Sequence, residues 1–157
     1  MSITISFRLV RDDDTDFVLS LLPRLVAFPL PDWRTRRDCL AGIGAELRAH
    51  LDEPPEHAEL FVAEDAVGTR VGFVELQRTR DYFNGRANAH VNQLAVAPEH
   101  EGEGIGRAML EHARAWARAR GCALLTLAVF PGNARARALY EACGYGIDLL
   151  RMARPVD

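Results

Sequence analysis

The sequence predicts an α/β protein with a mixed, mostly antiparallel sheet flanked by helices. Runs of strand-like alternation are interleaved with runs of helical spacing, and proline or glycine separates most of them. The 157 residues are 48% hydrophobic, which is enough for one core of ordinary size. Repeats, low-complexity stretches and linkers are absent from the sequence. We therefore expect a single domain over residues 1–157.

The first third of the chain predicts one strand and two helices. Residues 3–10 alternate in part and end at an acidic run that is suited to cap a helix. Apolar side chains at helical spacing follow over residues 17–25, where Pro23 is expected to kink or end the helix. A second helix is predicted over residues 33–51, with Asp32 as its cap.

The middle of the chain predicts a hairpin followed by a central strand. Residues 59–65 and 70–78 form two strand patterns around the Val-Gly-Thr turn at 67–69. The connection over residues 79–86 is polar and aromatic, a composition that suits a specificity loop. Residues 87–96 then form the strand that we expect at the centre of the sheet.

The last third predicts two helices and two strands. A helical pattern covers residues 104–120, and a nearly continuous apolar run at 121–129 suits a strand covered on both faces. A second helix is expected over residues 133–143. The tail, residues 145–153, can supply one last strand.

A glycine-rich connection joins the central strand to the helix that follows it. The strand pattern must stop at Pro98, which has no backbone donor, and Gly102, Gly104 and Gly106 lead directly into the helix. The first N–H groups of a helix lack intrahelical partners and lie at the positive end of its dipole, and glycine lets an anion approach the backbone. This order of elements predicts an anion cradle.

Two common phosphate loops do not fit this stretch. A dinucleotide loop requires G-x-G-x-x-G, but Arg107 and Met109 break that spacing, and a nucleotide-triphosphate loop requires a lysine, which this chain lacks. The stretch instead resembles motif A of the GNAT superfamily, the acyl-CoA-dependent N-acetyltransferases. That motif reads Arg or Gln, two residues, Gly, one residue, then Gly or Ala. Gly104 and Gly106 fill the glycine positions, whereas Glu101 departs from the family pattern.

A second segment strengthens this resemblance. Residues 133–145 look like motif B of the same family, in which an Asn opens a helix and Leu-Tyr-Glu precedes Gly and an aromatic residue. The match covers Asn133, Tyr140 and Gly144, among others. Two motifs in the expected order are far more specific than one. The chain therefore resembles a GNAT N-acetyltransferase.

The resemblance implies a fold, a cosubstrate and a reaction. The strand holding residues 94–96 is expected to splay from the strand holding residues 124–129, and the wedge between them would hold the thioester of acetyl-CoA. The acetyl group would pass directly to a primary amine of a small molecule or peptide, without a covalent enzyme intermediate. The implied acetyl-CoA site consists of Leu94, Ala95, Val96, Glu101, Gly102, Glu103, Gly104, Ile105, Gly106, Arg107, Asn133 and Tyr140.

The resemblance indicates a general acid but leaves several candidates for the general base. The resemblance suggests Tyr140 as the donor of a proton to the leaving CoA thiolate. The family often places a carboxylate just before the central-strand Leu, but residues 92–93 are amides here and cannot act as bases. Glu75, on the preceding strand, is the first substitute, and His90, Asp81 or an ordered water are the alternatives.

Glu101 raises a question about turnover. Together with Glu103 it puts carboxylates beside the expected pyrophosphate site, where they should repel the phosphates without abolishing binding. This departure and the missing strand carboxylate favour an alternative function, a non-catalytic acyl-CoA sensor or regulatory module on the same fold.

Bulk composition excludes several other classes. A net charge of −3, with the basic residues dispersed, gives no field suited to nucleic acid or an anionic membrane. The three cysteines show neither disulfide nor metal-ligand spacing, so no metal is expected. The sequence shows neither a signal peptide nor a membrane-spanning apolar run, which favours the cytoplasm. The expected partner is an amine acceptor, and a homodimer remains open.

Overall fold

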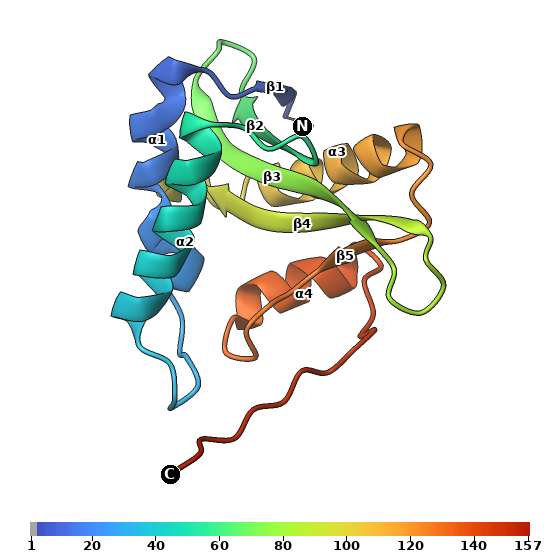
Figure 1. Ribbon diagram of the computed structural model, residues 1–157. Helices are drawn as coiled ribbons and strands as arrows, with labels where there is room; N and C mark the ends of the chain where they lie inside the picture. Colours follow the sequence, from blue (N-terminus) through green and yellow to red (C-terminus); the bar gives the residue numbers. More distant parts are fainter. Residues whose placement is uncertain (1–2) are drawn as a thin grey trace.

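A five-stranded sheet forms the centre of the computed structural model, which describes residues 3–157 (Figure 1). The strands follow chain order across the sheet, and the first four are antiparallel neighbours, whereas the last runs parallel to the fourth. The strands are β1 (Ser6–Leu9), β2 (Ala58–Glu64), β3 (Arg70–Arg80), β4 (Ala87–Val96) and β5 (Leu125–Leu127). The predicted α/β class with a mixed, mostly antiparallel sheet is confirmed.

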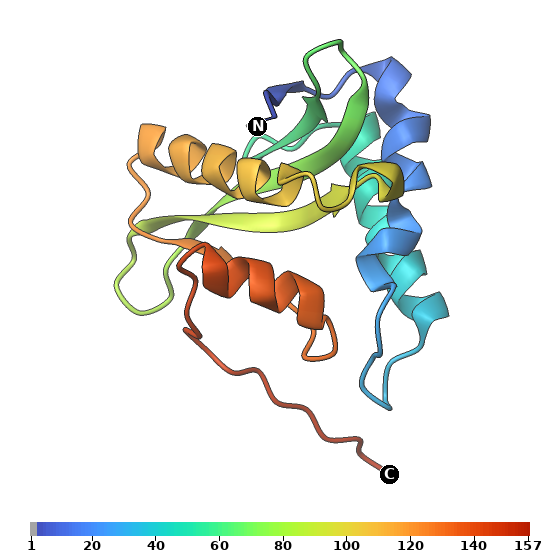
Figure 2. The same ribbon diagram turned by 180° about the vertical axis from the view of Figure 1, so that it is seen from behind.

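Helices cover both faces of this sheet, as the two opposite views show (Figures 1 and 2). One face carries α1 (Thr15–Ser20), α2 (Arg36–Asp52) and the short 3-10 helix η2 (Leu22–Val26). The other carries α3 (Ile105–Ala119) and α4 (Ala134–Ala142). Two further 3-10 turns are η1 (Asp12–Asp14) and η3 (Pro98–His100).

Helix α3 supplies the larger half of the core because its apolar side chains recur at helical spacing on one face. Ile105, Met109 and Ala113 are almost fully buried against β3 and β4. Gly72 on β3 makes this close packing possible, since a side chain there would collide with the Ala95 carbonyl and with Met109. The glycine loop, the connection that contains Gly102, Gly104 and Gly106, is therefore anchored to the sheet by α3.

Helices α1 and α2 build the second half of the core on the opposite face. Val18 and Leu47 are fully buried there, against Phe73 of β3 and Ala95 of β4. Successive residues of a strand point to opposite faces, so Phe73 faces α2 whereas its neighbour Val74 faces α3. Both faces of β3 and β4 are thus fixed by packing.

Two predicted boundaries were wrong. The α2 helix begins at Arg36 rather than at 33, because the hydroxyl of Thr35, not Asp32, accepts a hydrogen bond from the Asp38 N–H at 3.1 Å. The apolar run at 121–129 forms only a three-residue strand, and its residues are half-buried because β5 lies at the sheet edge.

The predicted strand at residues 145–153 was also wrong. This segment runs in extended form away from the body of the molecule (Figure 1) and pairs with no strand of the described chain. Ile147 is 78% exposed and Met152 is 90% exposed. Apolar character alone therefore does not make a strand, which also needs backbone hydrogen bonds to a neighbouring strand.

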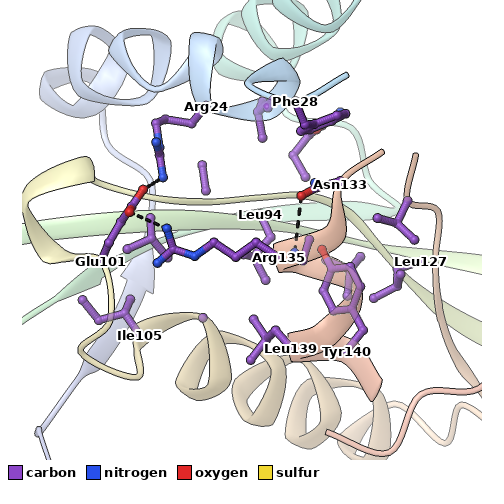
Figure 3. Close-up of a pocket in the computed structure, with 18 of the residues that line it drawn as sticks. Arg24, Phe28, Leu94, Glu101, Ile105, Leu127, Asn133, Arg135, Leu139 and Tyr140 are labelled. Carbon is purple, nitrogen blue, oxygen red and sulfur yellow. Dashed lines mark hydrogen bonds and ion pairs between the residues drawn. The ribbon is translucent and has the colours of Figure 1, made fainter. Parts of the chain in front are cut away.

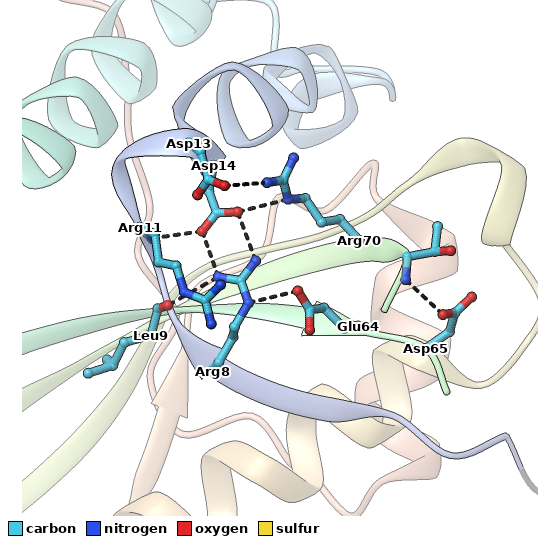
Figure 4. Close-up of polar contacts among 9 residues, drawn as sticks. Arg8, Leu9, Arg11, Asp13, Asp14, Glu64, Asp65 and Arg70 are labelled. Atoms are coloured by element: carbon cyan, nitrogen blue, oxygen red, sulfur yellow. Dashed lines mark hydrogen bonds and ion pairs between the residues drawn. The ribbon is translucent and has the colours of Figure 1, made fainter. Parts of the chain in front are cut away.

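A buried carboxylate ties the first strand to the sheet (Figure 4). Asp14 is fully buried, and its two oxygens accept hydrogen bonds from Arg8 at 2.7 and 2.9 Å and from the Arg11 N–H at 2.7 Å. Its Oδ1 also forms an ion pair with Arg70 Nε at 2.8 Å. The bidentate bond from Arg8 is the main reason why the pKa of Asp14 is lowered. β1, β3 and the start of α1 therefore meet at one charged group.

We expect Asp14→Ala to lower the free energy of unfolding by roughly 3 kcal/mol, because two guanidinium groups lose their shared partner. Urea denaturation measures the change. Asp13→Ala is the matched control: its side chain is 69% exposed and lies 3.3 Å from Arg70, so we expect a loss below about 1 kcal/mol. Equal losses in the two variants would contradict the role of Asp14.

Candidate active site

A cavity of about 510 Å³ opens where β4 and β5 part (Figure 3). The two strands pair only from Ala89 to Val91 on β4 and from Leu125 to Leu127 on β5. Beyond this point residues 92–96 line one wall of the cavity and residues 127–130 line the other. The predicted splay of the two strands is confirmed, and no strand within residues 3–157 pairs with β4 on that side beyond Val91.

A bulge in β4 sets the direction of the backbone donors at this edge. Glu75 of β3 pairs with Gln93 and the next residue pairs with Val91, so Asn92 is an extra residue. The Ala89 N–H donates to the Leu124 carbonyl, just before β5, whereas the Ala97 N–H donates to the opposite side, at the Val71 carbonyl of β3. A regular strand would direct both N–H groups to one side, and the bulge reverses them.

The backbone donors of the open edge follow from this reversal. Because the Ala97 N–H points to β3, alternation directs the Ala95 N–H to β3 as well and the N–H groups of Leu94 and Val96 away from it. That side is the cavity, which both residues line. Two neighbouring donors therefore face a space without a strand.

The glycine loop closes one end of the cavity. Gly102 and Gly104 have φ angles of +77° and +81°, which other residues rarely adopt, and Gly104 immediately precedes the first turn of α3. Gly106 lies against Leu139 of α4, so a side chain there would collide. The free N–H groups at the start of α3 can receive an anion here. Glu103 does not line the cavity, and its Oε2 lies 3.1 Å from His100 Nδ1.

Helix α4 forms the opposite wall. Asn133 caps the helix, since its Oδ1 accepts a hydrogen bond from the Ala136 N–H at 3.3 Å. One face of α4 then presents Ala136, Leu139 and Tyr140 to the cavity. Burial raises the pKa of Tyr140, so its hydroxyl stays protonated at neutral pH.

Glu101 lies in the cavity wall between two arginines (Figure 3). Its Oε1 forms an ion pair with Arg24 of η2, and its Oε2 accepts a hydrogen bond from Arg135 of α4. Arg107 lines the same cavity. Glu101 was expected, with Glu103, to repel the phosphates, but the structure gives it two cationic partners.

Glu75 is buried directly behind the open edge of β4. Only 2% of the residue is exposed, its Oε2 lies 2.6 Å from His50 Nδ1 of α2, and its Oε1 accepts a hydrogen bond from the Asn92 amide. Asn92 lines the cavity, whereas Glu75 does not. The carboxylate is therefore one side chain away from the cavity. A second carboxylate, Glu46, also accepts from the Asn92 amide, at 3.1 Å.

The other two candidate bases lie outside the cavity. His90 Nδ1 is 2.8 Å from the Thr126 hydroxyl, and burial lowers the pKa of this histidine. Asp81 accepts hydrogen bonds from Asn88 and from the Phe83 N–H, which lower the pKa of its carboxyl. Asp81 shapes the turn that starts β4, at the end of that strand farthest from the cavity.

The structure thus brings together most of the residues that the sequence analysis assigned to this site. All of the implied acetyl-CoA residues except Glu103 line one cavity. Sequence reasoning missed Arg24, Phe28 and Arg135. Arg135 was detectable, because it lies inside motif B, two residues after Asn133. Arg24 and Phe28 come from the distant η2 region and carried no local signal.

Residues 3–157 lack both a metal-binding cluster and a helix suited to cross a membrane. These residues contain no group of three or more His, Cys, Asp or Glu side chains that could hold a metal ion. Among the helices of this part of the chain, none combines the length and the apolar character that crossing a membrane requires.

Comparison with known proteins agrees with this architecture. Residues 25–145 match the model of the acetyltransferase (GNAT) family. The chain is 37% identical over 89 residues to an aminoglycoside N(6')-acetyltransferase type 1 of Stenotrophomonas maltophilia, covering 55% of this chain and 58% of that protein. It is 43% identical over 58 residues to the ribosomal protein bS18 alanine N-acetyltransferase of Escherichia coli, covering 37% and 39%.

A solved structure shares the fold over nearly the whole chain. Aminoglycoside N-acetyltransferase AAC(6')-Iy, solved in complex with CoA, has a TM-score of 0.68 and 19% identity, and the match covers 99% of this chain and 97% of that one. The chain spans less than two thirds of the length of the two curated relatives above. The match to the family model, by contrast, extends over most of this chain. The protein belongs to the GNAT acetyltransferase family.

Proposed function

We propose that this protein is an N-acetyltransferase that transfers an acetyl group directly from acetyl-CoA to a primary amine of a small molecule or peptide. The observation that carries the proposal is the open edge of β4, where two backbone donors face a cavity that runs from the glycine loop to Tyr140. A cavity with an anion-binding loop at one end and an open strand edge along its wall suits an extended, phosphate-bearing thioester.

The open edge of β4 has a chemical role in this proposal. The N–H groups of Leu94 and Val96 hydrogen-bond the thioester oxygen, which gains negative charge as the amine attacks, and each such donor contributes on the order of 3 kcal/mol. Carbonyl groups of the same edge pair with the amides of the pantetheine arm, as an added strand would. The phosphates lie at the residues of the glycine loop that line the cavity.

Two proton transfers complete the reaction. A lysine-like amine has a pKa of about 10.4 and must lose a proton before it attacks. We assign this proton to Glu75, acting through water beside Asn92, because Glu75 is the candidate base that accepts a hydrogen bond from a side chain of the cavity lining. Tyr140, neutral and exposed to the cavity, then protonates the departing CoA thiolate.

The acceptor is an amine on either a small molecule or a protein. The two relatives named above illustrate both types, since one is named for aminoglycosides and the other for an alanine of a ribosomal protein.

We expect the purified protein to release CoA thiol from acetyl-CoA when a suitable amine is present. A panel of aminoglycosides, amino acids and peptides with free N-termini, followed with a thiol reagent, measures this release. The control omits the amine. Acetyl-CoA binding in calorimetry without turnover on any amine would instead select the non-catalytic sensor.

Tyr140→Phe removes the proton donor and keeps the packing of the ring. We expect kcat to fall by about 10²–10⁴-fold, the usual range for a general acid, with little change in acetyl-CoA affinity. Tyr145→Phe is the matched control, because Tyr145 packs beside Tyr140 with ring centroids 5.9 Å apart but does not line the cavity. An unchanged kcat for Tyr140→Phe, with chemistry limiting turnover, excludes this role.

Glu75→Gln should lower kcat/KM by roughly 10²-fold near neutral pH, where the amine still needs a base. The loss should shrink toward pH 10, where much of the amine is already deprotonated. Glu46→Gln is the control, since Glu46 contacts the same Asn92 amide from the exposed side. If Glu46→Gln loses activity and Glu75→Gln does not, the base is Glu46. Circular dichroism checks that both variants fold.

A further inference from the structure

Glu101 occupies a position between two guanidinium groups that come from opposite sides of the cavity. Arg24 belongs to η2, on the α2 side of the sheet, and Arg135 belongs to α4, on the α3 side (Figure 3). The side chain of Glu101 is 27% exposed, so the carboxylate is part of the wall and not a free surface group. Each of its oxygens contacts one arginine.

This cluster has more donors than one carboxylate can satisfy. Two guanidinium groups against one carboxylate leave a net positive charge, and Arg107 adds another on the same cavity wall. The Nε of Arg24 is buried and has no hydrogen-bond partner among residues 3–157. A buried donor without a partner is costly, so the arrangement favours an anion with more acceptor oxygens than a carboxylate.

The cluster also lies beside the glycine loop. Glu101 immediately precedes Gly102, and the N–H groups at the start of α3 border the same cavity. A phosphate group has three terminal oxygens, and arginine binds phosphate through paired N–H donors. A diphosphate bound at the glycine loop would therefore lie in the same part of the cavity as Arg24 and Arg135.

We propose that Arg24 and Arg135 form a side-chain phosphate site that Glu101 fills as an internal anion in the free protein and that the diphosphate of the donor takes over on binding. The identity of the ligand as acetyl-CoA rests on the proposed function. Glu101 then acts as a built-in competitor for the two arginines. It also links η2 to α4 across the cavity until the ligand enters.

Inorganic pyrophosphate tests this site without any acyl transfer, and calorimetry at low ionic strength gives its affinity. Because each arginine loses a charged contact, Arg24→Gln and Arg135→Gln should each weaken pyrophosphate binding by roughly 3- to 20-fold. Because the competitor is removed, Glu101→Gln should tighten it by about 2- to 10-fold. Arg114→Gln is the matched charge control, since Arg114 is exposed on α3 beside Glu111 and does not line this cavity.

A combined variant separates competition from simple repulsion. If Glu101 acts by occupying the arginines, Glu101→Gln should give no gain in a protein that already carries Arg24→Gln and Arg135→Gln. If Glu101 only repels the phosphates, the gain should persist or grow there, which would overturn the proposal. Circular dichroism confirms that each variant folds.

The remaining outcomes are equally decisive. Affinity for pyrophosphate that is insensitive to both arginine changes, or no binding at millimolar concentration, overturns the site even if the protein acetylates amines. Arginine-dependent binding and an improved Glu101→Gln variant support the site even if no amine is acetylated. The failure of the site and the failure of the proposed function are therefore distinguishable.

Discussion

A parallel strand pair held by only three residue pairs leaves the following half of β4 with one open edge. Backbone N–H and C=O groups at such an edge need partners, because burying them unpaired costs free energy comparable to a lost hydrogen bond. The bulge at Asn92 decides which donors face this edge. The cavity therefore follows from the pairing geometry, and a bound chain that pairs as a strand would complete the sheet.

Packing on both faces of the sheet keeps this edge open. Helix α3 fixes β3 and β4 on one side, through Met109 and its neighbours, while α2 fixes them on the other through Leu47. Helix α4 lines the cavity beyond this edge, and its Leu139 packs closely against α3 at Gly106. Neither strand can then move toward the other without breaking a packed layer.

The charge along the cavity differs from one part to another. The glycine-loop end carries the arginines, with Glu101 between two of them, and attracts phosphates. The Asn92 amide donates to two carboxylates, the buried Glu75 and the exposed Glu46, whose negative charge favours a cation nearby. Tyr140 lies in the wall of the same cavity. In a partly desolvated space these charges act more strongly than in water.

The sequence by itself determined the local features: the apolar periodicity of α3, the glycines that lead into it, the Asn133 that opens α4 and the motif residues that line the cavity. These depend on neighbours within one or two turns of chain. Only the tertiary structure decided that Glu101 meets Arg24, that β5 stops after three residues and that residues 145–153 find no strand partner. Each of these features depends on which segments, far apart in the chain, become neighbours in the fold. Neither hydrophobic periodicity nor motif spacing specifies that.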